Sequence, residues 1–289
     1  MKSIVVLVLS LSINLCAIAQ VKNQADWQQR VDYNINVSLD DVAHQLDGDI
    51  TMNYTNNSPD ELGLIYIHLW PNGYKNNSTA FAKQMRQNGE MDFHYSKAKD
   101  RGYLDSIQFS ADSKNVQIEN TDDIDVIKIL LPQPLKSGQS VTLKSSFRVK
   151  LPKVFSRLGH QDQDYFITQW YPKPAVYDVN GWNPMPYLNM GEFYSEFGSC
   201  EVNITLPDNY TLVATGECQN EEELSNFKRA LGDSVGSSQK LKSVKFTADR
   251  VHDFAWFASK RWGYVTKKVK VGEREITARV VAAEPNVSD

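Results

Sequence analysis

The chain has 289 residues, of which 41% are hydrophobic, 11% aromatic and 23% charged, and its formal net charge is −4. This composition is that of a globular protein and excludes a disordered, collagenous or coiled-coil chain. The length suffices for one large domain or two of ordinary size, each with a real core. Because no long basic run is present and the net charge is negative, nucleic acid is a poor candidate partner.

The first 19 residues have the features of an export signal. A short positive region precedes an apolar stretch at 4–15, which is too short to span a bilayer as a helix. Ala17-Ile18-Ala19 places small residues at the −3 and −1 positions of a signal-peptidase site, so we predict cleavage between Ala19 and Gln20. Cys16 as a lipidated cysteine is the alternative, but a bulky leucine precedes it where a lipobox has a small residue. We expect a secreted or periplasmic protein with no membrane span.

The body of the chain follows a period-two pattern of apolar and polar residues, which is typical of half-buried strands. Between the early strands, Asn56-Asn57-Ser58-Pro59-Asp60 is a turn signal. Only two segments, 79–88 and 221–231, favour short helices. The sequence therefore predicts an all-β fold, a saddle-like or sandwich arrangement of large antiparallel sheets with one or two short helices. In chain order the expected strands are 31–39, 46–54, 62–70, 103–109, 127–131, 141–147, 201–206, 210–215, 242–247 and 264–281.

Two cysteines, Cys200 and Cys218, remain after the signal. The strands at 201–206 and 210–215 flank a turn centred near Asn209, which would set the two cysteines opposite each other in a hairpin. A disulfide is then geometrically reasonable in an oxidising compartment, and two small buried thiols are the equal alternative. Two cysteines without a matching pair cannot close a zinc site.

No known catalytic motif is present. The five histidines lie far apart, and the chain has no H-E-x-x-H, nucleophile elbow, Walker loop or dinucleotide fingerprint. The acidic residues of 122–125 could suggest calcium, but a solvated turn is favoured because the other EF-hand ligands are missing. His160 with Asp162 and Asp164 could bind a metal weakly, and a polar loop is favoured there too. The sequence predicts no metal site and no catalytic residue.

One stretch holds a third of the chain's 31 aromatic residues, together with four prolines. The prolines predict irregular backbone rather than ladder-bonded strands. Such a segment suits either a ligand-facing or domain-facing surface, or the closure of one end of a sheet core, and the sequence favours neither. Its ten aromatic residues are Tyr165, Phe166, Trp170, Tyr171, Tyr177, Trp182, Tyr187, Phe193, Tyr194 and Phe197.

Read in order, several segments resemble the N-terminal β-domain of the aminopeptidase N type of zinc metallopeptidase, the gluzincins with a thermolysin-like catalytic domain. The resemblance covers essentially the whole mature chain, and its specificity comes from the order and spacing of the pieces. Those pieces are VDYNINVSLD at 31–40, LDGDITMNYTNNS at 46–58, IHLW at 67–70, PLKSGQSVTL at 134–143, YFITQWYPKPAVYD at 165–178 and VHDFAWFAS at 251–259.

The resemblance implies a signal peptide at 1–19, an N-terminal β-domain at 20–282, and the start of a catalytic domain at 283–289. In this family the zinc is held by H-E-x-x-H and a distal glutamate, and a G-x-M-E-N segment binds the substrate backbone. None of these is in the sequence. The resemblance therefore implies a chain with no zinc of its own, inactive alone, whose partners are its catalytic domain and, through that parent, a peptide substrate.

The resemblance also implies two substrate-binding residues. Gln169 matches the glutamine that family members direct into the substrate cleft. Two positions on, where aminopeptidases place a carboxylate or amide that anchors the free amino group, this chain has Tyr171. A phenol is uncharged near neutral pH, so strict aminopeptidase specificity is in doubt. The alternative for Gln169 is a surface strand residue.

A rival hypothesis is a free-standing secreted β-sandwich module that binds carbohydrate or protein. In it, Trp170, Trp182 and Tyr187 would be stacking platforms for a sugar.

Overall fold

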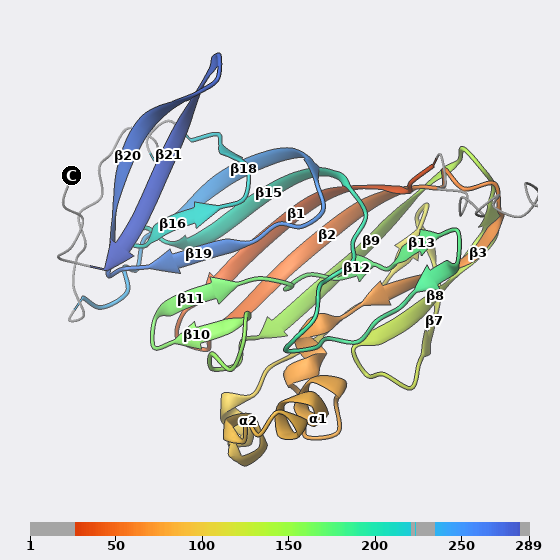
Figure 1. Cartoon of the computed structure of the whole chain (residues 1–289), viewed down its shortest axis with the longest axis horizontal. Coiled ribbons are helices and arrows are strands. Elements are labelled where there is room, and N and C mark those ends of the chain that lie inside the picture. Colours follow the sequence, from red (N-terminus) through yellow and green to blue (C-terminus); the bar gives the residue numbers. More distant parts are fainter. Residues whose placement is uncertain (1–26, 221–222, 224–234, 284–289) are drawn as a thin grey trace, which may run out of the picture.

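A computed structural model describes residues 27–220, 223 and 235–283. Strands dominate, and helices are few and short (Figure 1). The expectation of a mostly-β fold built from several antiparallel sheets is confirmed. Across these described residues, no helix is long and apolar enough to cross a membrane. The export signal at 1–19 and the expected helix at 221–231 lie outside the described residues, Glu223 excepted.

A nine-stranded sheet forms the largest layer, with the order β17-β18-β15-β1-β2-β9-β5-β6 and β4 paired to β9. Its long strands alternate buried and exposed residues, because one face covers the core and the other meets solvent. All pairs are antiparallel except β1 with β15. The strands are β1 (Arg30–Asp40), β2 (Gln45–Thr55), β4 (Tyr103–Asp105), β5 (Ser110–Ala111), β6 (Lys114–Asn115), β9 (Ser140–Lys150), β15 (Gly198–Pro207), β17 (Glu217–Cys218) and β18 (Leu241–Val251).

The parallel pair depends on a glycine. Gly198 opens β15 next to β1, and a Cβ atom at this position would lie 1.7 Å from the backbone oxygen of Val31. Only glycine permits this approach. On the other side of β15, its register with β18 shifts between Gly198 and Cys200, which marks a bulge at the same place.

Two four-stranded sheets and a small hairpin contribute to the same hydrophobic core as the large sheet. One has the order β12-β3-β8-β7, with β3 (Leu62–His68), β7 (Gln117–Asn120), β8 (Val126–Leu135) and β12 (Lys173–Pro174). The other has the order β10-β11-β19-β16, with β10 (Gly159–Gln161), β11 (Asp164–Ile167), β16 (Thr211–Ala214) and β19 (Trp256–Ser259), and the hairpin is β13 (Val176–Asp178) with β14 (Gly181–Asn183).

The helices follow β3 and project from one side of the molecule (Figure 1). The predicted helix at 79–88 is confirmed as α1 (Ala80–Gln87), whose first turn is capped by Thr79 accepting from the backbone N–H of Ala82. The strand predicted to reach Trp70 ends at His68, because Pro71 belongs to a 3₁₀ turn. The other short helices are η1 (Trp70–Tyr74), α2 (Asp92–Tyr95) and η2 (Ala98–Asp100).

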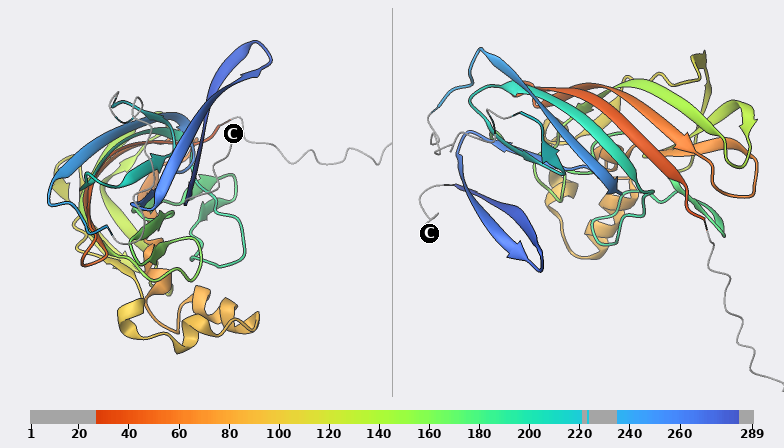
Figure 2. Two further views of the ribbon diagram at one scale, coloured as in Figure 1. Left: turned by 90° about the vertical axis from the view of Figure 1, so that its left-hand side faces the viewer. Right: turned by 90° about the horizontal axis from the view of Figure 1, so that it is seen from above.

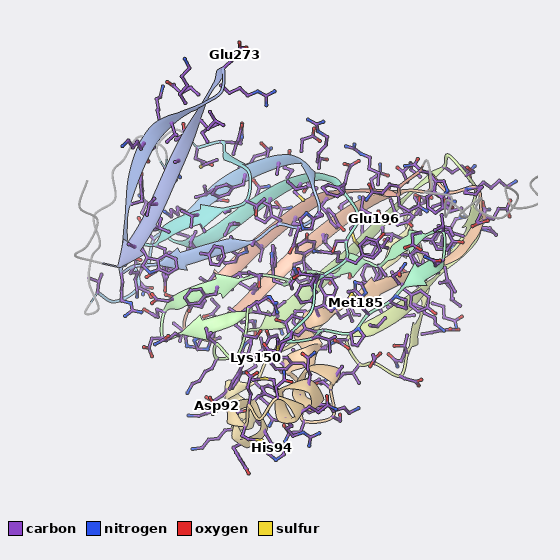
Figure 3. The ribbon with its side chains drawn as sticks, viewed as in Figure 1. Asp92, His94, Lys150, Met185, Glu196 and Glu273 are labelled. Carbon is purple, nitrogen blue, oxygen red and sulfur yellow. The ribbon has the colours of Figure 1, made fainter. Side chains whose placement is uncertain are left out.

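The single strand predicted at 264–281 is wrong. The segment is a hairpin of β20 (Trp262–Val271) and β21 (Arg274–Ala283), turning at Gly272 with a φ of 59°. This left-handed conformation suits a two-residue hairpin turn. The hairpin stands away from the rest of the molecule, with Glu273 at its tip (Figures 2 and 3).

The hairpin predicted around Asn209 is also wrong, and with it the geometry of the disulfide. β15 pairs with β1 and β18, whereas β16 pairs with β19 in another sheet. Cys200 lies opposite Ala248 and Cys218 opposite Phe246, on the two sides of β18. Two strand spacings separate them by roughly 10 Å, beyond the reach of a disulfide. Both are free thiols, Cys200 buried and Cys218 partly exposed.

Candidate functional site

Gln169 and Tyr171 lie on the segment that joins β11 to β12, and both are buried in the described chain. Gln169 is 8% exposed and Tyr171 1%. Gln169 has a φ of 52°, a left-handed conformation that is uncommon for a residue with a Cβ atom. Gln169 is therefore not a surface strand residue, the alternative that the sequence had left open.

Both side chains converge on Asp253, which lies in the connection between β18 and β19. The Gln169 amide donates to Asp253 Oδ2 through Nε2, and the Tyr171 hydroxyl donates to Oδ1 over 3.1 Å. The backbone N–H of Phe254 donates to the same Oδ1 over 2.8 Å. The negative charge on Asp253 contributes, after burial, to holding the pKa of Tyr171 well above its usual range, so the phenol stays protonated.

A buried lysine completes this group, which we call the Asp253 cluster: Gln169, Tyr171, Lys173 and Asp253. Lys173, the first residue of β12, is 1% exposed, and its Nζ lies 2.6 Å from Asp253 Oδ1 and 3.5 Å from Gln169 Oε1. Its ammonium also lies 5.0 Å from the centre of the Tyr171 ring and 5.3 Å from that of Trp70. A carboxylate and two aromatic faces together offset the cost of burying the cation.

His68 lies opposite Lys173 in the neighbouring strand β3. Its ring stacks on Trp70 with centroids 4.3 Å apart, and neither of its ring nitrogens has a hydrogen-bond partner among the described residues. Burial, with a smaller contribution from the Lys173 charge, lowers the pKa of His68 to about 3. The imidazole beside the cluster is therefore neutral at physiological pH.

The aromatic stretch contributes mostly to the core. Tyr165, Trp170, Tyr171 and Tyr187 are at most 1% exposed, whereas Tyr194 and Phe197 are each 45% exposed. The rival hypothesis of sugar-stacking platforms is therefore not supported, because two of its three residues, Trp170 and Tyr187, present no ring face to solvent. The Trp170 indole instead donates to the backbone oxygen of Phe254 over 3.0 Å, beside the Asp253 cluster.

Glu196 is a buried acid that the sequence did not single out. It is 2% exposed, and its Oε1 accepts from the backbone N–H of Tyr177 in β13 over 3.3 Å (Figure 3). Its Oε2 and the nearby hydroxyl of Tyr54 have no hydrogen-bond partner among the described residues. Burial raises the pKa of Glu196 to about 7. No local sequence signal marks it, since Tyr-Ser-Glu-Phe reads as an ordinary polar loop.

Within the described ranges, no group of three His, Cys, Asp or Glu side chains could hold a metal ion. The weak set at His160 is occupied by other contacts, since Asp164 pairs with Arg261 and accepts from Ser259, and the His160 ring stacks on His44 with centroids 3.7 Å apart. In the acidic 122–125 turn, Asp125 is 2% exposed and accepts from the backbone N–H of Tyr187 over 2.6 Å. The Asp125 carboxylate is thus turned to the backbone of the aromatic stretch.

The fold of the described chain is similar to part of several solved M1 zinc metallopeptidase structures. No family model and no curated protein matches the sequence. Among solved structures, a point mutant of a two-domain M1 zinc metallopeptidase bound to L-tryptophan matches with a TM-score of 0.52 and 14% identity, over 91% of this chain and 50% of that one. An M1 zinc metallopeptidase from Deinococcus radiodurans matches with a TM-score of 0.51 and 14% identity, over 91% and 49%.

This chain thus spans about half the length of the metallopeptidase structures that it matches. At 14% identity the likeness establishes the fold. The resemblance predicted from the sequence is confirmed at that level, and the coverage is consistent with an N-terminal domain of such an enzyme.

Proposed function

We propose that this chain is the non-catalytic N-terminal part of a secreted zinc metallopeptidase whose full-length parent hydrolyses peptides in an aminopeptidase-like way. One observation carries the proposal: the fold match covers 91% of this chain but only half of the M1 metallopeptidase structures. The other half would supply the zinc and the general base, neither of which the motifs of this sequence provide. The partners of the chain are then its own catalytic domain and a peptide substrate.

In this proposal Gln169 and Tyr171 shape the substrate cleft. Support comes from their rigid placement, since both hydrogen-bond to Asp253. Tyr171 is neutral, and the nearby carboxylate of Asp253 is already paired with Lys173. The cluster therefore offers no unpaired negative charge to a substrate ammonium, and we expect a parent that does not depend strictly on a free N-terminus. One matched structure, the Deinococcus radiodurans mutant, is described as bound to a Tyr-Ser-Ala substrate.

The proposal includes export through the signal at 1–19. N-terminal sequencing of the mature protein from the periplasm or culture medium is expected to begin at Gln20. An N-terminus at Met1, or lipid on Cys16, would contradict it.

The decisive experiment is the apparent mass of the native protein in its source cells, by immunoblot against this region. A band well above 32.8 kDa, from a reading frame that encodes H-E-x-x-H downstream, supports the proposal, and a single band at or below that mass contradicts it. The isolated 289-residue chain is expected to carry no stoichiometric zinc and to cleave no amino-acid anilide. One zinc per chain by elemental analysis would also refute the proposal.

A further inference from the structure

We propose that Asp253 is a positioning residue: its carboxylate, held by Lys173, fixes the backbone and the amide orientation of Gln169. The inference rests on the proposed function only where it treats Gln169 as facing substrate. The tie itself is a property of this chain alone. It joins two connections that are far apart in sequence, one between β11 and β12 and the other between β18 and β19.

The pattern of contacts exceeds what an ion pair requires. Lys173 and Asp253 alone would satisfy each other's charge. Yet the same carboxylate also accepts from Gln169 and Tyr171, so that every second side chain of the stretch 169–173 reaches one acceptor 80 to 84 residues away. The indole of Trp170, which falls between them, donates to the next backbone oxygen, that of Phe254. The stretch is therefore anchored along its whole length to one short connection.

Gln169 needs such an anchor. Its φ of 52° lies in the left-handed region, which a residue with a Cβ atom does not favour by itself. Residues held in such conformations persist where the surroundings over-determine them. Here the side-chain amide donates to Asp253, and the neighbouring Trp170 is 0% exposed. Asp253, together with the longer contact from Lys173, holds the side chain of this residue in place.

The tie also decides which way the Gln169 amide points. Because Nε2 donates to Asp253, the oxygen Oε1 is the end that lies toward Lys173, 3.5 Å from its Nζ. A carboxylate accepts but cannot donate when ionised, so the reversed amide would face Asp253 with an oxygen. The two ends of the amide are thus assigned, with Nε2 on the Asp253 carboxylate and Oε1 on the Lys173 ammonium.

An exchange of donor and acceptor tests this directly in the 289-residue chain. Gln169→Glu sets two carboxylates against each other and is expected to raise the unfolding equilibrium constant, measured in urea at pH 7, by about 30-fold or more. In Gln169→Glu/Asp253→Asn, the new amide can donate to the new carboxylate and Lys173 keeps one negative partner. The double variant is expected to return to within about fivefold of wild type, a coupling that only residues in contact show.

Hydrogen exchange distinguishes a local effect at Gln169 from a general loss of stability, because it is measured peptide by peptide. In Asp253→Asn, backbone exchange of peptides covering 168–173 is expected to rise about tenfold relative to peptides from β2 and β9, and to fall back in the double variant. The matched control is Asp249→Asn, an exposed carboxylate on the same strand end, which should neither change exchange nor rescue Gln169→Glu.

Two results would overturn the proposal. One is a double variant that is no more stable than the less stable of the two single variants. The other is unchanged hydrogen exchange at 168–173 in Asp253→Asn. If Gln169→Glu alone fails to fold, the double variant and Asp253→Asn still decide, because the inference requires both to fold and to differ at 168–173. None of these measurements needs catalysis or zinc. If these experiments contradict the role of Asp253, the metallopeptidase proposal is unaffected. If the metallopeptidase proposal is wrong, the contacts between Asp253 and Gln169 are unaffected.

Discussion

Glu196 gives a pH-dependent prediction whose size can be worked out. The folded protein holds the pKa of this buried acid at about 7, whereas its ordinary value is 4.5. Between these two pH values the folded state keeps a proton that the unfolded chain has released. The folded state is therefore stabilised less and less as pH rises through this window. The difference of about 2.5 pH units corresponds to about 3 kcal/mol.

The perturbation is Glu196→Gln, which resembles the protonated acid in shape but does not titrate. The free energy of unfolding, from urea denaturation, should favour the variant over wild type increasingly between pH 4 and pH 8, by about 3 kcal/mol in total. Other titrating groups are the same in both proteins and cancel. Glu192→Gln, exposed in the same loop, is the control and should show a constant difference. A Glu196→Gln difference that is equally constant would refute the reasoning.

Three further predictions concern other parts of the molecule. Because the pKa of His68 is lowered to about 3, this residue should reduce the free energy of unfolding as pH falls below 6.5. His68→Phe keeps a ring on Trp70 and should remove about 4 kcal/mol of that acid-induced loss, measured by urea denaturation at pH 3–7. In protein that starts at Gln20, a thiol reagent should label Cys218 in the native state but Cys200 only after unfolding, because burial raises the pKa of Cys200 to about 12. A disulfide-linked pair in the mass spectrum would contradict this. Gly198→Ala should lower the free energy of unfolding by about 3 kcal/mol or more, because the added methyl group meets the Val31 carbonyl. Gly63→Ala, with open space around it, is the control, and equal stability of the two variants would exclude the clash.

The strands could be predicted where one face of a sheet is buried and the other is exposed to solvent. β1, β2 and β9 alternate residue by residue, and the predicted boundaries differ from the structure by a few residues. The turn at Gly272 was missed because valines and isoleucine alternate on both sides of it, so the pattern continues through the hairpin. The partners of β15 could not be predicted, since pairing with β1 depends on residues 167 positions away.

The site was predicted only in part. Gln169 and Tyr171 came from the resemblance, and the structure brings them together at Asp253. Asp253 and Lys173 carry no local signal, because an ion pair between residues 80 positions apart leaves no spacing to read. The segment at 251–259 resembles the family's closing strands, and that resemblance does not mark Asp253 as the acceptor of the cluster.

The parallel pairing of β1 with β15 has a consequence for synthesis of the chain. Tyr33 emerges from the ribosome early, but its partner Cys200 follows only after most of the domain has been made. At a synthesis rate of about 5–20 residues per second, one edge of β1 stays unpaired for roughly 10–30 seconds before β15 has been made. During that interval its open backbone groups are a template for any other strand that arrives first. A factor that holds the nascent or exported chain unpaired would protect this edge until β15 is available.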